Sequence, residues 1–527
     1  MFDESLNKST QQKQMDVHVR YWHAGQVTSR YLGSEFMGHA TAADKLKKLT
    51  SSLSGLYLPN IIQISMDGPN VNWKLFETLQ SDLKTQSNVS LLNVGSCGLH
   101  QVHEAFKNGS KASGWDVDKL LSSFYWIFKD TPARREDFVN ETNSTEFPLK
   151  FCNHRWVENV PVCERAIAVL PAIQKYVSAL AAKRCTDPKT KSFITISENV
   201  RDPLLPVKLA NIWSIAKLIQ PFLTIYQSDA PMIPFLYGDL KSLINSLMER
   251  FVKTDVLKHA NSIHKINIAD DKNLLDYKKV DVGFSAQKIL KDLLSAKKIS
   301  DRQFMEFRME CRAFLQGVVK QLLLKSPLNY NLAKNISVLD PRRMSNTDTR
   351  DINKNQFRDM LRTLVDAGRF AEKDADTAMT QYSEFIDNIV FKHISKFATF
   401  DPSKSRVDVL LFDYMASDTS YNKLWIIVKQ LLLLSHGQAT VERGFSVNRH
   451  IEVENITDET VSSRRMICDH MKFVGGITNI DITNKRLLIS CSSARQKYVA
   501  HLEDEKKESA ATAEGKNEKL LKVKLVS

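Results

Sequence analysis

Apolar and polar positions in the first hundred residues alternate in the manner of strands and short helices. In residues 15–22 every second position is apolar, which predicts a strand. Gly25 provides a turn into a second, antiparallel strand over residues 26–38. Thr41 and Asp44 predict a capping box for a helix that ends near residue 53. Short apolar runs at 61–65 and 91–96 predict two more strands, each followed by a helix.

Strand signals become rare after about residue 110, and apolar positions recur instead at helical spacing. One such face runs from Leu236 to Phe251, and another from Phe304 to Leu322. Prolines divide part of this region into shorter helices, at positions 203, 206, 221, 231 and 234. The pattern predicts a helical domain over residues 161–400.

The C-terminal part begins with a polar connection, residues 402–420, around a short apolar stretch. Residues 422–447 are again helical in pattern and contain the most apolar run of the chain, "LWIIVKQLLLL" at 424–434. Residues 481–527 mix acidic and basic side chains with little apolar surface, so we expect this tail to be disordered or a loosely held helix.

Composition narrows the class of partner. The net charge of +13 favours a polyanion such as DNA. Seven scattered cysteines without CxxC pairs fit an intracellular, reducing compartment. The N-terminus lacks an apolar signal core, and the apolar run at 424–434 is broken by Lys429 and Gln430, so we expect no membrane segment. Neither a Walker loop nor a dinucleotide-binding motif is present, and we expect no small-molecule substrate.

Three carboxylates are candidates for chemistry, and each also has an ordinary interpretation. Asp67 follows a predicted strand, where α/β sheets carry ligands, but it also fits an Asp-Gly turn. Asp3, near the chain start, fits a solvated terminal carboxylate. Glu442 lies beside Arg443 in the middle of a helix that reads as buried. A buried carboxylate requires a partner or a function, and a structural ion pair between helices would satisfy the first requirement.

Cys97 and His100, in "SCGLHQVH", have the C-x2-H spacing of half a zinc site. No second half follows at finger spacing, and the nearest other Cys/His pair lies in "CNHRWVENV", residues 152–160. Structural or DNA-facing roles are therefore favoured over metal binding for these residues.

Five short motifs together resemble hAT-superfamily DNA transposases, in the order in which that family carries them. They are Asp3 in "FDESLN", Asp67 in "MDGPNVN", Cys97 and His100 in "CGLH", Arg155 and Trp156 in "HRWVE", and Glu442 and Arg443 in "QATVERGFSVNR". The resemblance covers about residues 1–475.

The resemblance implies an α/β fold with an all-α insertion: a ribonuclease H-like core interrupted by a large helical domain. Residues 1–160 would form the first part of the core and residues 161–400 the insertion. Residues 401–480 would be the C-terminal hAT dimerisation region that completes the core, followed by the tail, 481–527.

The resemblance also implies a function in the nucleus on transposon DNA. Asp3, Asp67 and Glu442 would be both catalytic residues and ligands of two Mg²⁺ or Mn²⁺ ions about 4 Å apart, which drive DNA strand transfer. Cys97, His100, Arg155, Trp156 and Arg443 would be further family-motif residues. The partners would be DNA and a second copy of the chain, bound through the C-terminal region.

Two departures from the family change the expectation. The BED-type zinc finger is missing, and only two residues precede Asp3, so the first strand lacks its N-terminal half. We therefore expect an N-terminally truncated member that binds DNA weakly, without sequence preference, and does not excise a transposon by itself. The alternatives are a domesticated, non-catalytic protein for DNA binding and dimerisation, or a non-functional transposon remnant.

Overall fold

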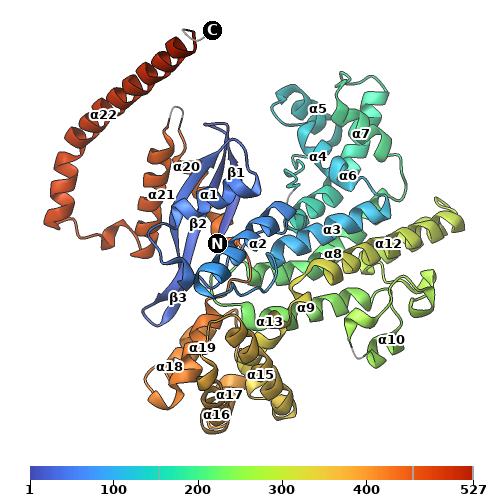
Figure 1. The fold of residues 1–527 in the computed structure, drawn as a ribbon. Helices are drawn as coiled ribbons and strands as arrows, with labels where there is room; N and C mark the ends of the chain where they lie inside the picture. The colour runs from blue at the N-terminus through green and yellow to red at the C-terminus, as the bar shows by residue number, and fades with distance from the viewer. Residues whose placement is uncertain (154, 261, 454–455, 525–527) are drawn as a thin grey trace. The chain divides into compact units, whose positions relative to one another are not determined.

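The computed structural model describes residues 1–153, 155–260, 262–453 and 456–524 (Figure 1). The chain forms two compact units, Met1–Ser462 and Ser463–Ser527. Residues 1–160 and 161–400, which we expected to be separate domains, belong to one unit. The division between the two units follows Ser462.

A three-stranded antiparallel sheet opens the first unit. Its strands are β1 (Phe2–Asn7), β2 (Gln12–His23) and β3 (Gln26–Met37), in the spatial order β1-β2-β3. Phe2 lies opposite Val17 in the first pair. Gly25, with φ +79°, forms the predicted turn between β2 and β3, which confirms the hairpin expected around it.

The strands predicted at 61–65 and 91–96 are not formed in the described residues, where these stretches are connecting segments. The first lies beside β1, with Phe2 N bonded to Ser65 O at 3.2 Å. The second lies beside the first, with Leu92 N bonded to Ile62 O at 2.7 Å and, just beyond, Cys97 N to Met66 O at 3.1 Å. Side chains replace the rest of the ladder. Arg369 donates to the carbonyl oxygens of Ile61 and Ser90, each at 2.8 Å.

The two faces of the sheet have different neighbours. Met15 and Val17 pack into a core with Leu49 of α1 (Ala42–Ser52) and Leu75 of α2 (Asn70–Ser87). The other face of β2 carries Asp16, whose Oδ2 accepts a hydrogen bond from Asn448 Nδ2 of α20 (Ala439–Ile451) at 2.8 Å. The alternation of β2 thus directs apolar side chains to α1 and α2, and polar ones to α20.

The start of β1 opens into a cavity of about 450 Å³ between β2 and residues 60–64. The Met1 amino group donates to His18 O at 3.0 Å, and burial lowers its pKa to about 5. The first strand, which we expected to be shortened, begins at Phe2. Met1 adds one further pair of backbone hydrogen bonds, both to His18, and the cavity lies next to it.

Helices make up most of the remaining first unit, as expected for 161–400. In that range the described residues contain one isolated β-bridge, Val252–Leu274, and no strand. The α-helices between residues 98 and 432 are α3 (Gly98–Ser113), α4 (Val117–Trp126), α5 (Pro132–Thr142), α6 (Val160–Ala181), α7 (Lys191–Asn199), α8 (Leu205–Tyr226), α9 (Ile233–Met248), α10 (Thr254–His259), α11 (Phe284–Ser295), α12 (Asp301–Lys325), α13 (Asn331–Asn335), α14 (Pro341–Met344), α15 (Arg350–Asp366), α16 (Ala375–Phe385), α17 (Ile394–Ala398), α18 (Val407–Met415) and α19 (Asn422–Leu432).

Local signals predicted some of these boundaries well. The capping boxes at Thr41 and Ser300 are both present, which confirms the starts of α1 and α12. Pro206 lies in the first turn of α8, but Pro221 lies inside that helix, so the break predicted there is wrong. The apolar stretch inside the expected connection 402–420 forms α18.

The second unit is helical. Helix α21 (Asp458–Phe473) crosses the boundary, and α22 (Lys485–Lys524) occupies most of the segment for which we expected disorder or a loosely held helix.

Candidate functional site

The candidate site lies where four distant parts of the chain meet. Asp67 follows the segment that runs beside β1, and Cys97 and His100 begin α3. Glu442 lies in the first turn of α20. Arg155 immediately precedes the 3₁₀-helix η2 (Trp156–Asn159). His154 of the same motif lies outside the described residues.

His100 joins the two carboxylates that are farthest apart in sequence. Its Nδ1 lies 2.9 Å from Asp67 Oδ1 and 3.3 Å from Glu442 Oε1. The two oxygens can therefore be no farther apart than the sum of these distances. The structure thus brings Asp67 and Glu442 together, close enough for a two-metal site with ions about 4 Å apart.

Asp3, on β1, completes a concentration of negative charge. Burial raises the pKa of Asp3 well above its usual value, and the charge of Asp67 raises it further. Glu442 adds a smaller effect in the same direction, and His100 opposes them. Three carboxylates therefore share one partly buried region, and their mutual charge disfavours the ionised form of Asp3.

Two cations offset this charge. Burial acts to lower the pKa of His100, but its contacts with Asp67 and Cys97 outweigh burial and raise the pKa to about 12. Arg155 Nη2 donates to Glu442 Oε2. Glu442 thus has two partners, and neither is its sequence neighbour Arg443, which donates to Gln227 O.

Two glutamines that the sequence analysis missed hold the start of α20 against the sheet. Gln438 Nε2 donates to Phe2 O and to Ser65 O. Gln63 donates to Ser435 O at 3.1 Å and accepts from Ser435 N at 2.6 Å. These bonds join β1, the segment before Asp67 and the residues before Glu442. Gln438 opens the motif "QATVERGFSVNR", but the sequence indicates the partners of neither glutamine, because these are backbone groups hundreds of residues away.

Trp156, expected as a family-motif residue, is fully buried rather than part of the site surface. Its ring lies 4.4 Å from Phe106 and 5.5 Å from Phe151, measured between centroids. It follows Arg155 directly in the chain, so its packing helps to hold the segment that carries this arginine.

A cavity of about 360 Å³ opens beside Glu442, between α6, α8 and α20. Its polar lining includes two guanidinium groups, two carboxylates and two amides. The lining residues are Arg155, Val157, Glu158, Pro161, Gln220, Leu223, Thr224, Gln227, Ala439, Glu442 and Arg443.

His436, in the segment before α20, gives the first unit a dependence on pH. Its Nε2 lies 2.9 Å from Tyr226 O, and burial lowers its pKa from 6.5 to about 4. Between these values the unfolded chain binds a proton that the folded chain does not, so the free energy of unfolding rises with pH. A pKa difference of this size corresponds to about 3 kcal/mol.

We expect His436→Gln to flatten the dependence of stability on pH between pH 4 and 6.5, because it removes this proton uptake. The measurement is urea unfolding at a series of pH values, with the exposed His39→Gln as the matched control. Equal slopes in the wild type and His436→Gln would contradict the prediction.

None of the described helices combines the length and hydropathy that a membrane-spanning helix needs. No protein-family model matches the chain, and a search of curated proteins finds no significant match.

Proposed function

We propose that this protein is derived from a hAT-type transposase and carries a metal-dependent site for cleaving and joining DNA phosphodiester bonds. The observation that supports the proposal most strongly is the meeting of Asp67 and Glu442 at one nitrogen of His100. These carboxylates are far apart in sequence, and the resemblance to the transposases implies that the same two residues belong to one catalytic site.

The donor set fits hard divalent cations. Asp3, Asp67 and Glu442 offer carboxylate oxygens, which Mg²⁺ and Mn²⁺ prefer. The pKa of Asp3 is raised first by burial and then by the charge of Asp67, and a nearby dication would act in the opposite direction. When bound, two such ions would activate water and stabilise the leaving oxygen of the phosphodiester.

The protein's own side chains would orient and balance this site. Arg155 fixes one oxygen of Glu442, and His100 lies against the other, so the carboxylate is held from both sides. Gln438 fixes the helix that carries it to Phe2, next to Asp3. Arg443 and Arg155 line the neighbouring cavity together with Glu158 and Glu442.

A non-catalytic DNA-binding protein is the second candidate, and His100 is the observation that favours it. The protonated ring lies between Asp67 and Glu442 and already compensates part of their charge without a metal. In this alternative the same side chains would form a structural ion cluster.

Mn²⁺-dependent cleavage of DNA that carries transposon ends tests the first candidate. The chain is assayed beside its Asp67→Asn variant. Cleavage that Asp67→Asn abolishes would support the first candidate. The absence of Asp67-dependent cleavage would favour the non-catalytic alternative.

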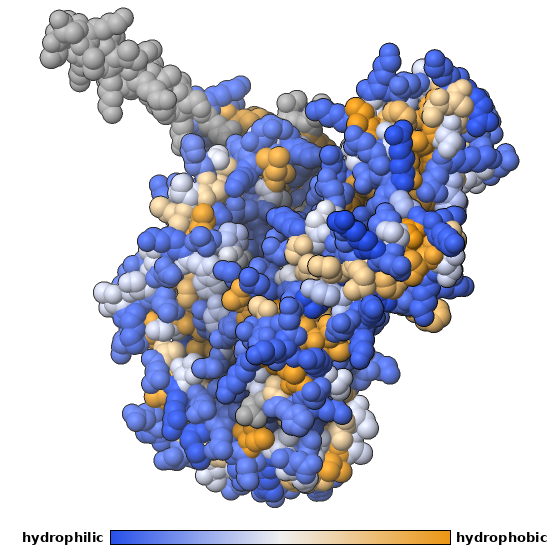
Figure 2. All heavy atoms as spheres, turned by 90° about the vertical axis from the view of Figure 1, so that its right-hand side faces the viewer, coloured by the Kyte–Doolittle hydropathy of each residue, from blue (hydrophilic) through white to orange (hydrophobic). Residues whose placement is uncertain are grey.

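DNA binding by the chain alone should depend on charge. The protein has a net charge of +13, and the face shown in Figure 2 is largely hydrophilic. Contacts to phosphates are therefore expected to contribute most of the binding energy. We therefore expect the logarithm of affinity to fall linearly with the logarithm of salt concentration, equally for unrelated sequences. Fluorescence anisotropy with two unrelated duplexes provides the measurement, and a marked preference for one duplex would contradict it.

The protein is also proposed to self-associate through its C-terminal region, although helix α19 offers little exposed apolar surface for such a contact. The apolar residues Leu424, Ile427, Val428, Leu431 and Leu432 are all buried within the first unit, and Ile426 is 40% exposed. The apolar excess of this run is therefore used mainly in the core. Light scattering at micromolar concentration tests self-association, and a monomer would count against it.

A further inference from the structure

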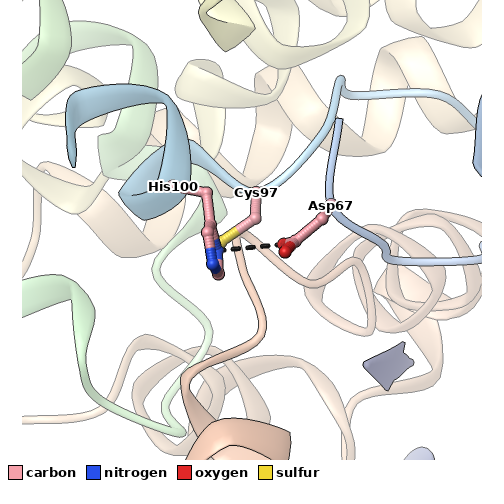
Figure 3. Close-up of side chains that lie close together, drawn as sticks. All are labelled: Asp67, Cys97 and His100. Atoms are coloured by element: carbon pink, nitrogen blue, oxygen red, sulfur yellow. Dashed lines mark ion pairs between the residues drawn. The ribbon is translucent and has the colours of Figure 1, made fainter. Parts of the chain in front are cut away.

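Asp67, Cys97 and His100 form a compact group of three different ligand types. One ligand atom from each residue, a carboxylate oxygen, a thiol sulfur and a ring nitrogen, lies within 4.8 Å of the other two. Figure 3 shows the three side chains directed toward one another, with Cys97 and His100 at the start of α3 and Asp67 on the opposite segment.

The contact between Asp67 and His100 is close but poorly directed. Asp67 Oδ1 and His100 Nδ1 are 2.9 Å apart, yet each is buried and lacks a hydrogen bond of acceptable geometry. Buried polar atoms normally have directed partners. Two such atoms can serve instead as ligands of a common ion.

We propose that Asp67, Cys97 and His100 bind a soft divalent cation of the zinc class. Thiolate, imidazole and carboxylate are the ligands zinc takes in proteins, at about 2.0–2.3 Å. Three protein ligands with one open position is the arrangement of an accessible rather than a closed zinc site. The thiolate makes this group unsuited to Mg²⁺, which takes oxygen ligands.

The geometry leaves the site reachable and places it against the carboxylate cluster. The side chains of Asp67 and His100 are 20% and 30% exposed, whereas Cys97 is buried behind them. Glu442 borders the group, with its Oε1 3.3 Å from His100 Nδ1.

This site shares only Asp67 with the set that would hold Mg²⁺ or Mn²⁺. Zinc binding itself does not depend on the function proposed above. One consequence does rest on that function: zinc at Asp67 would exclude the harder ions and inhibit DNA cleavage.

The test is a Co²⁺ titration of the full chain, followed by the absorption that a cobalt–thiolate bond produces, and then displacement of cobalt by Zn²⁺. We expect Cys97→Ser to abolish this absorption and to weaken Zn²⁺ binding at least about a hundredfold, since loss of even an outer-shell partner costs 10–100-fold. The matched control is Cys491→Ser, which removes an exposed thiol from the second unit and should leave the absorption intact.

Thermal unfolding provides a second measurement that does not depend on the cobalt signal. Zn²⁺ should raise the midpoint of the wild type and of Cys491→Ser, but not of Cys97→Ser. Cobalt absorption that persists in Cys97→Ser, or that is lost in Cys491→Ser, would show adventitious thiol binding and overturn the proposal. Failure of the proposed DNA chemistry would leave the cobalt absorption unchanged, so the two proposals fail separately.

Discussion

Replacing Glu442 by glutamine is expected to weaken Mn²⁺ binding at least about a hundredfold. Loss of an outer-shell partner of a metal already costs 10–100-fold in affinity, and Glu442 is proposed as a direct ligand. Glutamine keeps an oxygen that can accept the hydrogen bond from Arg155, so the start of α20 should keep its position. The change therefore removes a negative charge with little change in shape.

Electron paramagnetic resonance of free Mn²⁺, titrated against the protein, measures this affinity directly. The matched control is Glu104→Gln on α3, the same chemical change at an exposed carboxylate on the helix that carries His100. Equal affinities in the wild type and Glu442→Gln would remove Glu442 from the metal site and leave it as the partner of Arg155 alone.

Replacing Trp156 by alanine is expected to lower the free energy of unfolding by about 3–5 kcal/mol, the usual range for truncating a buried tryptophan. The side chain is fully buried, and its ring packs against Phe106 and Phe151. The cavity left behind would be closed only partly by those rings. Trp126→Ala, at a side chain that is 50% exposed, should cost less than about 1 kcal/mol.

Urea unfolding of both variants provides the comparison, with DNA binding measured in parallel. A structural role for Trp156 requires that stability falls while the folded fraction keeps its affinity for DNA. A variant of normal stability that had lost DNA binding would instead assign Trp156 to a nucleic-acid surface.

Residues of the candidate site could be selected from the sequence, but the contacts that hold them in place could not be predicted. Asp67 and Glu442 were selected because their motifs resemble one family, and the structure brings both to His100. Burial of Trp156 was not foreseen, because a motif gives a residue's position in the chain and not its depth. The bonds of Gln438 to Phe2 and Ser65 leave no local pattern.

The helices and strands show the same difference between features that depend on neighbouring residues and features that depend on distant ones. The capping boxes at Thr41 and Ser300 depend on side chains three residues apart, and both helix starts were predicted correctly. The stretch 61–65 has the composition of a strand, but Arg369 takes the carbonyl group of Ile61 that a ladder would have used. Pro221 is accommodated inside α8, whose apolar residues are buried on most sides.

The bonds of Gln438 have a consequence for the order of events on the ribosome. The carbonyl groups of Phe2 and Ser65 receive the amide of Gln438 only after more than 370 further residues have been synthesised. At about 5–20 residues per second, that interval is roughly 20–90 s. Throughout it Asp3 and Asp67 lack Glu442 and the arginine–carboxylate bond that fixes it. The growing chain therefore carries an incomplete site, which closes only when the start of α20 has been made.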